Sequence, residues 1–129
     1  MAFEAPAYRV PTLVAAADLS DYQFHFVKLT DENTINVCDA ITDVPIGVLQ
    51  NDPDEGEAAE VVAIGVTKLV TEENLTAGQL VSTNANGHAI LCEPGSDTTV
   101  YIAGIALADS TSGETASILI NLGAPARAQ

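Results

Sequence analysis

The feature that most constrains the fold is a segment that occurs twice. Residues 46–63 read as an aliphatic run, an acidic turn that contains glycine, and a second aliphatic run. Residues 103–120 repeat this order without a gap, 57 positions later. The matched positions are Gly47 with Gly104, Asp52 with Asp109, Gly56-Glu57 with Gly113-Glu114, and Ala59 with Ala116. Each copy therefore predicts a strand, a tight turn and a returning strand.

The repeat continues outside this hairpin at a slightly different spacing. Cys38 aligns with Cys92, and residues 31–33 align with residues 85–87, at an offset of 54 positions. The two cysteines thus occupy one position of the repeat, which favours a packing role over paired redox chemistry. Two β units of about 55 residues, neither able to bury its apolar face alone, are expected to close on each other. The sequence predicts an all-β fold, as an antiparallel barrel or a sandwich.

From Tyr22 onward, alternating apolar residues and turn signals predict β-structure. Asn84 to Gly87 has the composition of a hairpin turn, and Gly65 is expected to form a bulge or bend within a long strand. Residues 71–78 fit either one helical turn or an irregular loop. Strands are expected over residues 22–29, 35–38, 46–50, 60–70, 79–83, 88–92, 100–108 and 116–122.

The first 22 residues are expected to form an extended arm that stands apart from this β domain. Pro6 and Pro11 exclude a central strand here. The apolar side chains of the arm would nevertheless be exposed to water unless a partner covered them. The candidate partner-interface residues are Tyr8, Val10, Pro11, Leu13 and Val14. The alternative is that the segment folds back on its own barrel as an edge strand.

The expected organisation is therefore an arm, a single β domain and a short tail. The β domain covers residues 23–123, with repeat halves over about 27–70 and 81–122. Residues 124–129 contain small side chains and one proline, which predicts a flexible tail.

The charge of the chain excludes several kinds of partner. Asp and Glu number 18 against four Lys and Arg, which gives a net charge of −14. Binding to nucleic acid or to an anionic membrane surface needs clustered basic residues, and the sequence has no such cluster. No apolar run approaches the ~20 residues that span a bilayer. Trp is absent and aromatic residues make up 5% of the chain, so a sugar-stacking site is not expected either.

No motif for catalysis or cofactor binding is present in the sequence. His25 and His88 lie in different predicted strands without further ligands at metal spacing. The acidic turn over residues 52–57 does not fit a calcium-binding loop, and its twin over residues 109–114 loses most of the carboxylates. Nucleophile elbows and phosphate-binding loops are also missing. We therefore expect no enzyme activity, no metal and no cofactor.

Several stretches together resemble one protein family. These are residues 75–89, residues 102–108, the Gly113-Glu114 turn before a closing aliphatic strand, and the proline-containing N-terminal segment. Over about residues 22–122 the chain resembles bacteriophage head decoration proteins, also called capsid cement proteins. The resemblance implies a small all-β structural protein without catalytic residues.

The resemblance also implies a place and a role. A cement protein binds the outer surface of an assembled capsid and stabilises contacts between major capsid protein subunits, often as a homotrimer. Its place would be the exterior of the virion, and the host cytoplasm during assembly. The alternative function for a small β protein of this kind is a ligand-binding or adhesin module on a β-sandwich.

Overall fold

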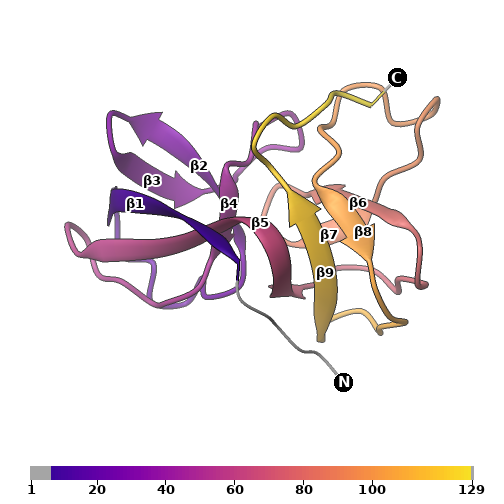
Figure 1. Ribbon diagram of the computed structural model, residues 1–129, viewed down its shortest axis with the longest axis horizontal. Coiled ribbons are helices and arrows are strands. Elements are labelled where there is room, and N and C mark those ends of the chain that lie inside the picture. The colour runs from indigo at the N-terminus through magenta and orange to yellow at the C-terminus, as the bar shows by residue number, and fades with distance from the viewer. Residues whose placement is uncertain (1–6, 129) are drawn as a thin grey trace.

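The computed structural model describes residues 7–128, and this part of the chain is all-β (Figure 1). It contains one mixed sheet of nine strands and no helix. The predicted all-β class is thus confirmed. The strands are β1 (Tyr8–Ala15), β2 (Phe26–Asp31), β3 (Thr34–Val37), β4 (Gly47–Leu49), β5 (Ala58–Val70), β6 (Leu80–Thr83), β7 (Ala89–Leu91), β8 (Gly104–Ala106) and β9 (Thr115–Asn121).

The first half of the sheet closes on itself. Its order is β1-β3-β2-β4-β5, and β1 pairs again with β5, so the hydrogen-bonded neighbours form a closed circuit of five strands. The pair β1–β3 is parallel and the other pairs are antiparallel. We call this circuit the first ring. Its buried apolar residues form one cluster, composed of Leu13, Ala15, Leu19, Val27, Ile35, Leu49, Ala59 and Val61.

The second half forms a matching circuit, here called the second ring. Its order is β5-β9-β8-β6-β7, and a parallel bridge between Thr71 and Ala89 links the end of β5 to β7. The 13-residue strand β5 belongs to both rings and runs between them in Figure 1. It changes partner near Gly65, where φ is 133°, from β1 on one side to β9 on the other. Gly65, where the sequence predicted a bulge or bend, therefore lies where β5 passes from one ring to the other.

The strand registers of the two rings correspond residue by residue. In the first ring Val48 pairs with Val62, and in the second ring Ile105 pairs with Leu119, each 57 positions later. The hairpins β2–β3 and β6–β7 also correspond, with an offset of 54 positions. Their matched pairs are Val27 with Val37 against Val81 with Leu91, and Leu29 with Ile35 against Thr83 with Ala89.

One glycine is required at the same place in each ring because two strands approach closely there. A Cβ added to Gly47 would lie 2.4 Å from the carbonyl oxygen of Val62. A Cβ added to Gly104 would lie 2.2 Å from the carbonyl oxygen of Leu119. Both distances are far below van der Waals contact, so any larger side chain would push the paired strands apart.

The structure corrects the prediction of an N-terminal arm. Residues 8–15 form β1, which lies between β3 and β5 and is part of the first ring. The register shifts between Val10 and Leu13, and Thr12 adopts a φ of 62°. This bulge accommodates Pro11, which has no N–H to donate to the ladder. An arm apart from the β core was therefore wrong for these residues. The chain does fold back on its own sheet, and residues 1–6 lie outside the described part.

Other boundaries differ from the prediction for local reasons. The strand expected over residues 22–29 begins only at Phe26, because Phe24 takes a φ of 63° and bends the chain. Residues 71–78 contain no helical turn, so the irregular loop is the correct alternative. Residues 124–128, expected as a flexible tail, lie against residues 100–102. The Ile102 N–H donates to the Ala126 carbonyl oxygen at 2.8 Å, and the Ala128 side chain is buried.

Candidate functional site

The two histidines, placed by the sequence in different strands, meet at the junction of the rings. His25 precedes β2 of the first ring and His88 precedes β7 of the second, and their Nε2 atoms are 3.0 Å apart. The Nδ1 atom of His25 lies 3.0 Å from the carbonyl oxygen of Gln23. The Nδ1 atom of His88 contacts the carboxylate of Glu72. The sequence offered no signal for this contact, since it depends on how the rings are joined.

The hydrogen-bond partners of the two histidines indicate which ring nitrogens carry hydrogen. A carbonyl oxygen only accepts, so Nδ1 of His25 carries a hydrogen. One further proton then lies between the two Nε2 atoms. Burial, followed by the proximity of His88, lowers the pKa of His25. With Nε2 of His25 left as an acceptor, the shared hydrogen lies on Nε2 of His88, and Nδ1 of His88 contacts the Glu72 carboxylate. The group is a satisfied structural network that joins the rings.

The acidic turn over residues 52–57 is a surface feature of the first ring. The side chains of Asp54, Glu55 and Glu57 are exposed. The neighbouring charges of Glu57 and Asp18 raise the pKa of Asp54, which shows uncompensated repulsion between carboxylates. Among the residues that the structure describes, no group of three or more Asp, Glu, His or Cys side chains is placed to hold a metal ion. This turn therefore connects strands and offers no ligand cage.

The cysteines are buried, as their shared position in the repeat indicated. Cys38 and Cys92 are both free thiols. Burial raises the pKa of Cys38 to about 12, and burial also raises the pKa of Cys92. A thiol that stays protonated is a poor nucleophile, so neither residue is suited to redox or covalent chemistry.

The five predicted interface residues separate into two groups. Leu13 points into the cluster of the first ring and is buried, while Val10 packs against the edge of that cluster. Tyr8, Pro11 and Val14 are exposed. Leu13 is therefore a core residue, and the structure leaves Tyr8, Pro11 and Val14 on the surface of β1.

A second apolar surface was missed by the sequence reasoning. It crosses β6, β8 and β9 of the second ring, where Leu80 pairs with Ile105 and Ile105 pairs with Leu119. We call these three residues the open row. Ile105 is 39% exposed and Leu119 is 42% exposed, although both are large aliphatic side chains. Such a contiguous apolar patch is typical of an interaction surface.

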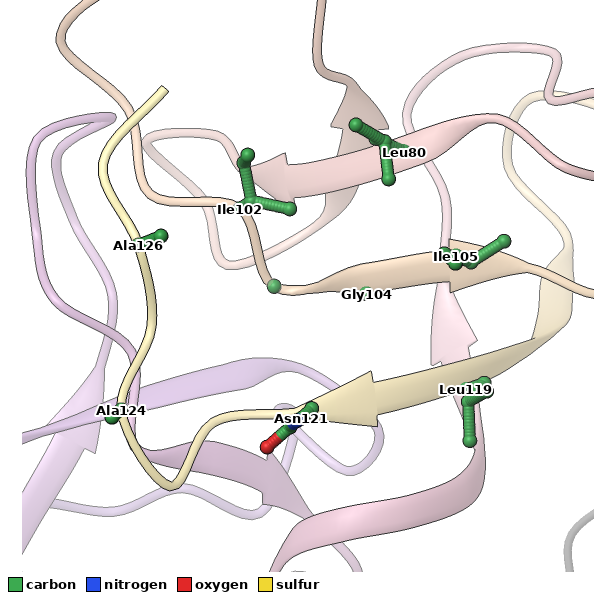
Figure 2. Close-up of a pocket in the computed structure, with 9 residues that line it drawn as sticks. Leu80, Ile102, Gly104, Ile105, Leu119, Asn121, Ala124 and Ala126 are labelled. Carbon is green, nitrogen blue, oxygen red and sulfur yellow. The ribbon is translucent and has the colours of Figure 1, made fainter. Parts of the chain in front are cut away.

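Next to the open row the surface is hollowed (Figure 2). The hollow has a volume of about 390 Å³ and lies between β8, the end of β9 and the C-terminal segment. In a chain with 18 acidic residues, none of the residues that line it is charged. The lining residues are Leu80, Ile102, Ala103, Gly104, Ile105, Leu119, Asn121, Ala124 and Ala126.

The first ring has the equivalent row, and there it is buried. Phe26 pairs with Val48 and Val48 pairs with Val62, at the positions that correspond to Leu80, Ile105 and Leu119. We call Phe26, Val48 and Val62 the covered row. All three are buried, and they pack in the same cluster as the core of the second ring. The sequence repeat already aligned Val48 with Ile105 and Val62 with Leu119, which was the signal that could have pointed to the open row.

Comparison with known protein families shows which family the chain belongs to. Residues 10–122 match the phage cement protein family. The chain belongs to this family. The resemblance found in the sequence is thereby confirmed, and so is the expectation that the protein is a structural component without enzyme activity. Family membership places it among the components of the phage head.

A solved structure shows the same fold at low sequence identity. It is the N base of head fiber gp8.5 in bacteriophage phi29, with a TM-score of 0.65 and 18% identity. The match covers 88% of this cement protein and 95% of the other chain. A comparison with curated proteins gave no match. Within residues 7–128, no helix is long and apolar enough to cross a membrane.

Proposed function

We propose that this cement protein binds the outer surface of an assembled capsid and holds neighbouring major capsid protein subunits together. The family match over residues 10–122 is the observation that carries the proposal. The structure supports it by its surface chemistry, since large apolar side chains such as Tyr8, Ile105 and Leu119 are exposed and able to bury area against a partner. On this proposal the protein lies on the virion exterior and, during assembly, in the host cytoplasm.

The mechanism is a shift of equilibrium by binding. A protein that binds the assembled shell, but not separated subunits, stabilises the shell by RT ln(1 + [L]/Kd) per site. This amounts to about 2.7 kcal/mol per site when the free concentration is a hundred times Kd. Many sites act on one shell, so a modest affinity per site produces a large resistance to disruption.

We also propose that the protein acts as a homotrimer on the capsid. A cement protein on a capsid lattice adopts the local symmetry of its position, and closed cyclic assemblies are the common solution. Tyr8, Val10, Pro11 and Val14 on β1 are the proposed contacts with the capsid or a sister subunit. Leu13 is left out because its side chain is buried in the first ring.

The matching registers further support a duplicated origin for the two rings. Strand pairs 57 positions apart and hairpin pairs 54 positions apart recur in the same order. Each ring alone would leave one apolar row exposed. We infer that one unit was duplicated and that the second unit covers the row of the first.

Undecorated heads test the proposed function. Purified protein is mixed with heads that lack it, and co-sedimentation and the temperature of head disruption are measured. We expect the protein to sediment with the heads and to raise the disruption temperature. Replacing Tyr8 by Asp should weaken co-sedimentation, whereas Ile41→Asp, at an exposed aliphatic residue outside the strands, serves as the matched control. Absent co-sedimentation together with an unchanged disruption temperature would overturn the proposal.

A further inference from the structure

The covered row shows which contacts bury an apolar row of this kind. Phe26, Val48 and Val62 pack in one apolar cluster with Ile120 and Leu122, which lie at the end of β9 in the second ring. The open row has the same aliphatic character at the same place in the repeat. Within residues 7–128, Ile105 and Leu119 keep about two fifths of their surface exposed. One chain therefore contains both a covered and an uncovered form of the same surface.

Part of the cover is the β6–β7 hairpin of the second ring. The N–H of Phe26 donates to the carbonyl oxygen of Gly87 at 2.8 Å. A Cβ on Gly87 would lie only 2.7 Å from Cγ2 of Val37, so the turn sits directly on the first ring. Thr83, at the end of β6, is buried, and its side chain lies beside the thiol of Cys38 of the first ring.

The equivalent hairpin of the first ring is exposed. It joins β2 to β3, and its Asn33 has the left-handed conformation of Gly87, with φ values of 54° and 76°. Leu29 occupies the position of Thr83 in this hairpin. Where Thr83 is buried, Leu29 is 51% exposed. A large aliphatic side chain therefore lies on the hairpin that corresponds to the internal cover.

One molecule therefore carries both surfaces that are needed for such a contact. The open row is one half, and the β2–β3 hairpin is the other. We propose that the open row binds the β2–β3 hairpin of a second copy of this chain, which repeats between chains the contact that joins the two rings within one chain. This proposal deepens the self-association proposed above and rests on it.

The geometry of the junction determines the kind of assembly. The row and the hairpin are different surfaces, so each copy offers one to each of two neighbours. Such a head-to-tail contact closes into a ring when its rotation fits a small number of copies, and otherwise extends as a filament. The hollow beside the row has no charged lining residue. It therefore adds no carboxylate to the contact between two acidic chains.

The assembly is tested with the protein alone, in the absence of heads. Mass is measured by native mass spectrometry and by light scattering after size exclusion. We expect the wild type to be larger than a monomer and to reach a defined mass. Ile105→Asp places a charge in the row and Leu29→Asp places one on the hairpin, so each variant should become monomeric. Ile41→Asp should keep the wild-type mass, because Ile41 is exposed to a similar extent, 44%, outside both surfaces.

Mixing the two variants tests the head-to-tail arrangement. Ile105→Asp keeps an intact hairpin and Leu29→Asp keeps an intact row, so an equimolar mixture should form dimers with one copy of each. Thermal unfolding of each variant shows whether it is folded, and Ile105→Ser and Leu29→Ser replace any variant that is not.

A monomeric wild type overturns the inference, as does a folded variant of either residue that keeps the wild-type mass. A mixture that stays monomeric also overturns it. Binding to heads is a separate measurement, so a failed junction and a failed cement function give different results.

Discussion

The Nε2 atoms of His25 and His88 lie 3.0 Å apart, although the residues are 63 positions apart in the chain. A single proton satisfies both atoms, and a second one would place two N–H groups face to face. The pKa of His25 is lowered mainly by burial, so the folded protein binds its proton less readily than the unfolded chain does. The histidine pair therefore links the contact between the rings to pH.

Stability should fall as the pH drops below about 6.5, the ordinary pKa of histidine. In that range His25 is protonated in the unfolded chain but stays neutral in the folded protein, so protonation favours unfolding. One group changes the free energy of unfolding by at most about 1.4 kcal/mol per pH unit. Melting temperatures at pH 7.5 and 5.5 measure the effect. His25→Asn should show a smaller change than the wild type, and an equal change in both would contradict the assignment.

Gly87→Ala should destabilise the protein more than Gly113→Ala. Both glycines have positive φ values, 76° and 88°, so alanine carries a conformational cost of about 1–2 kcal/mol at either position. At Gly87 the added Cβ would also meet Val37 and the carbonyl oxygen of Phe26, whereas at Gly113 it would meet nothing within 4 Å. Overlap adds roughly 1–3 kcal/mol. Denaturant unfolding of the two variants compares them, and equal losses would show that the turn does not press on the first ring.

Leu13→Ala and Val14→Ala separate the two faces of β1. Leu13 is buried in the first ring, so the cavity left by alanine should cost about 2–5 kcal/mol. Val14 is exposed, and its replacement should cost less than about 1 kcal/mol. Chemical denaturation measures both values. Near-native stability of Leu13→Ala would show that β1 is an arm that contributes little to the stability of the fold.

The double replacement of Asp54 by Asn and Glu55 by Gln should leave stability nearly unchanged. Both side chains are exposed, and changes at such positions are usually within about 0.5 kcal/mol. Melting of the wild type should also be the same with calcium or with EDTA. A calcium-dependent rise in melting temperature that disappears in the double variant would contradict this prediction and reveal an ion site.

Cys38 and Cys92 should resist alkylation while the protein is folded. Both are buried, and the pKa of Cys38 is raised to about 12, so the thiolate is scarce at neutral pH. Mass spectrometry after brief iodoacetamide treatment should find no adducts in buffer and two in guanidinium chloride. Rapid labelling of Cys38 in buffer would show that the junction between the rings opens.

The sequence determined the local elements and their repeat. A period of two in apolar residues and glycine-containing turns are local signals, so the strands ending at Leu49 and Val70 and the turn before His88 could be read directly. The alignment of Val48 with Ile105 also foretold matching registers, because a register follows from the pattern of apolar residues.

Only the tertiary structure decided how β1 and the two rows are used. Pro11 has no N–H to donate, so the sequence predicted no central strand there. In the structure a bulge accommodates Pro11, and β1 pairs with β3 on one side and with β5 on the other, which closes the ring. The rows at Val48 and at Ile105 look alike in sequence, yet one is buried and the other is exposed. Which of them is covered depends on how the rings sit against each other. That placement arises from contacts between residues far apart in the chain, which no local pattern encodes.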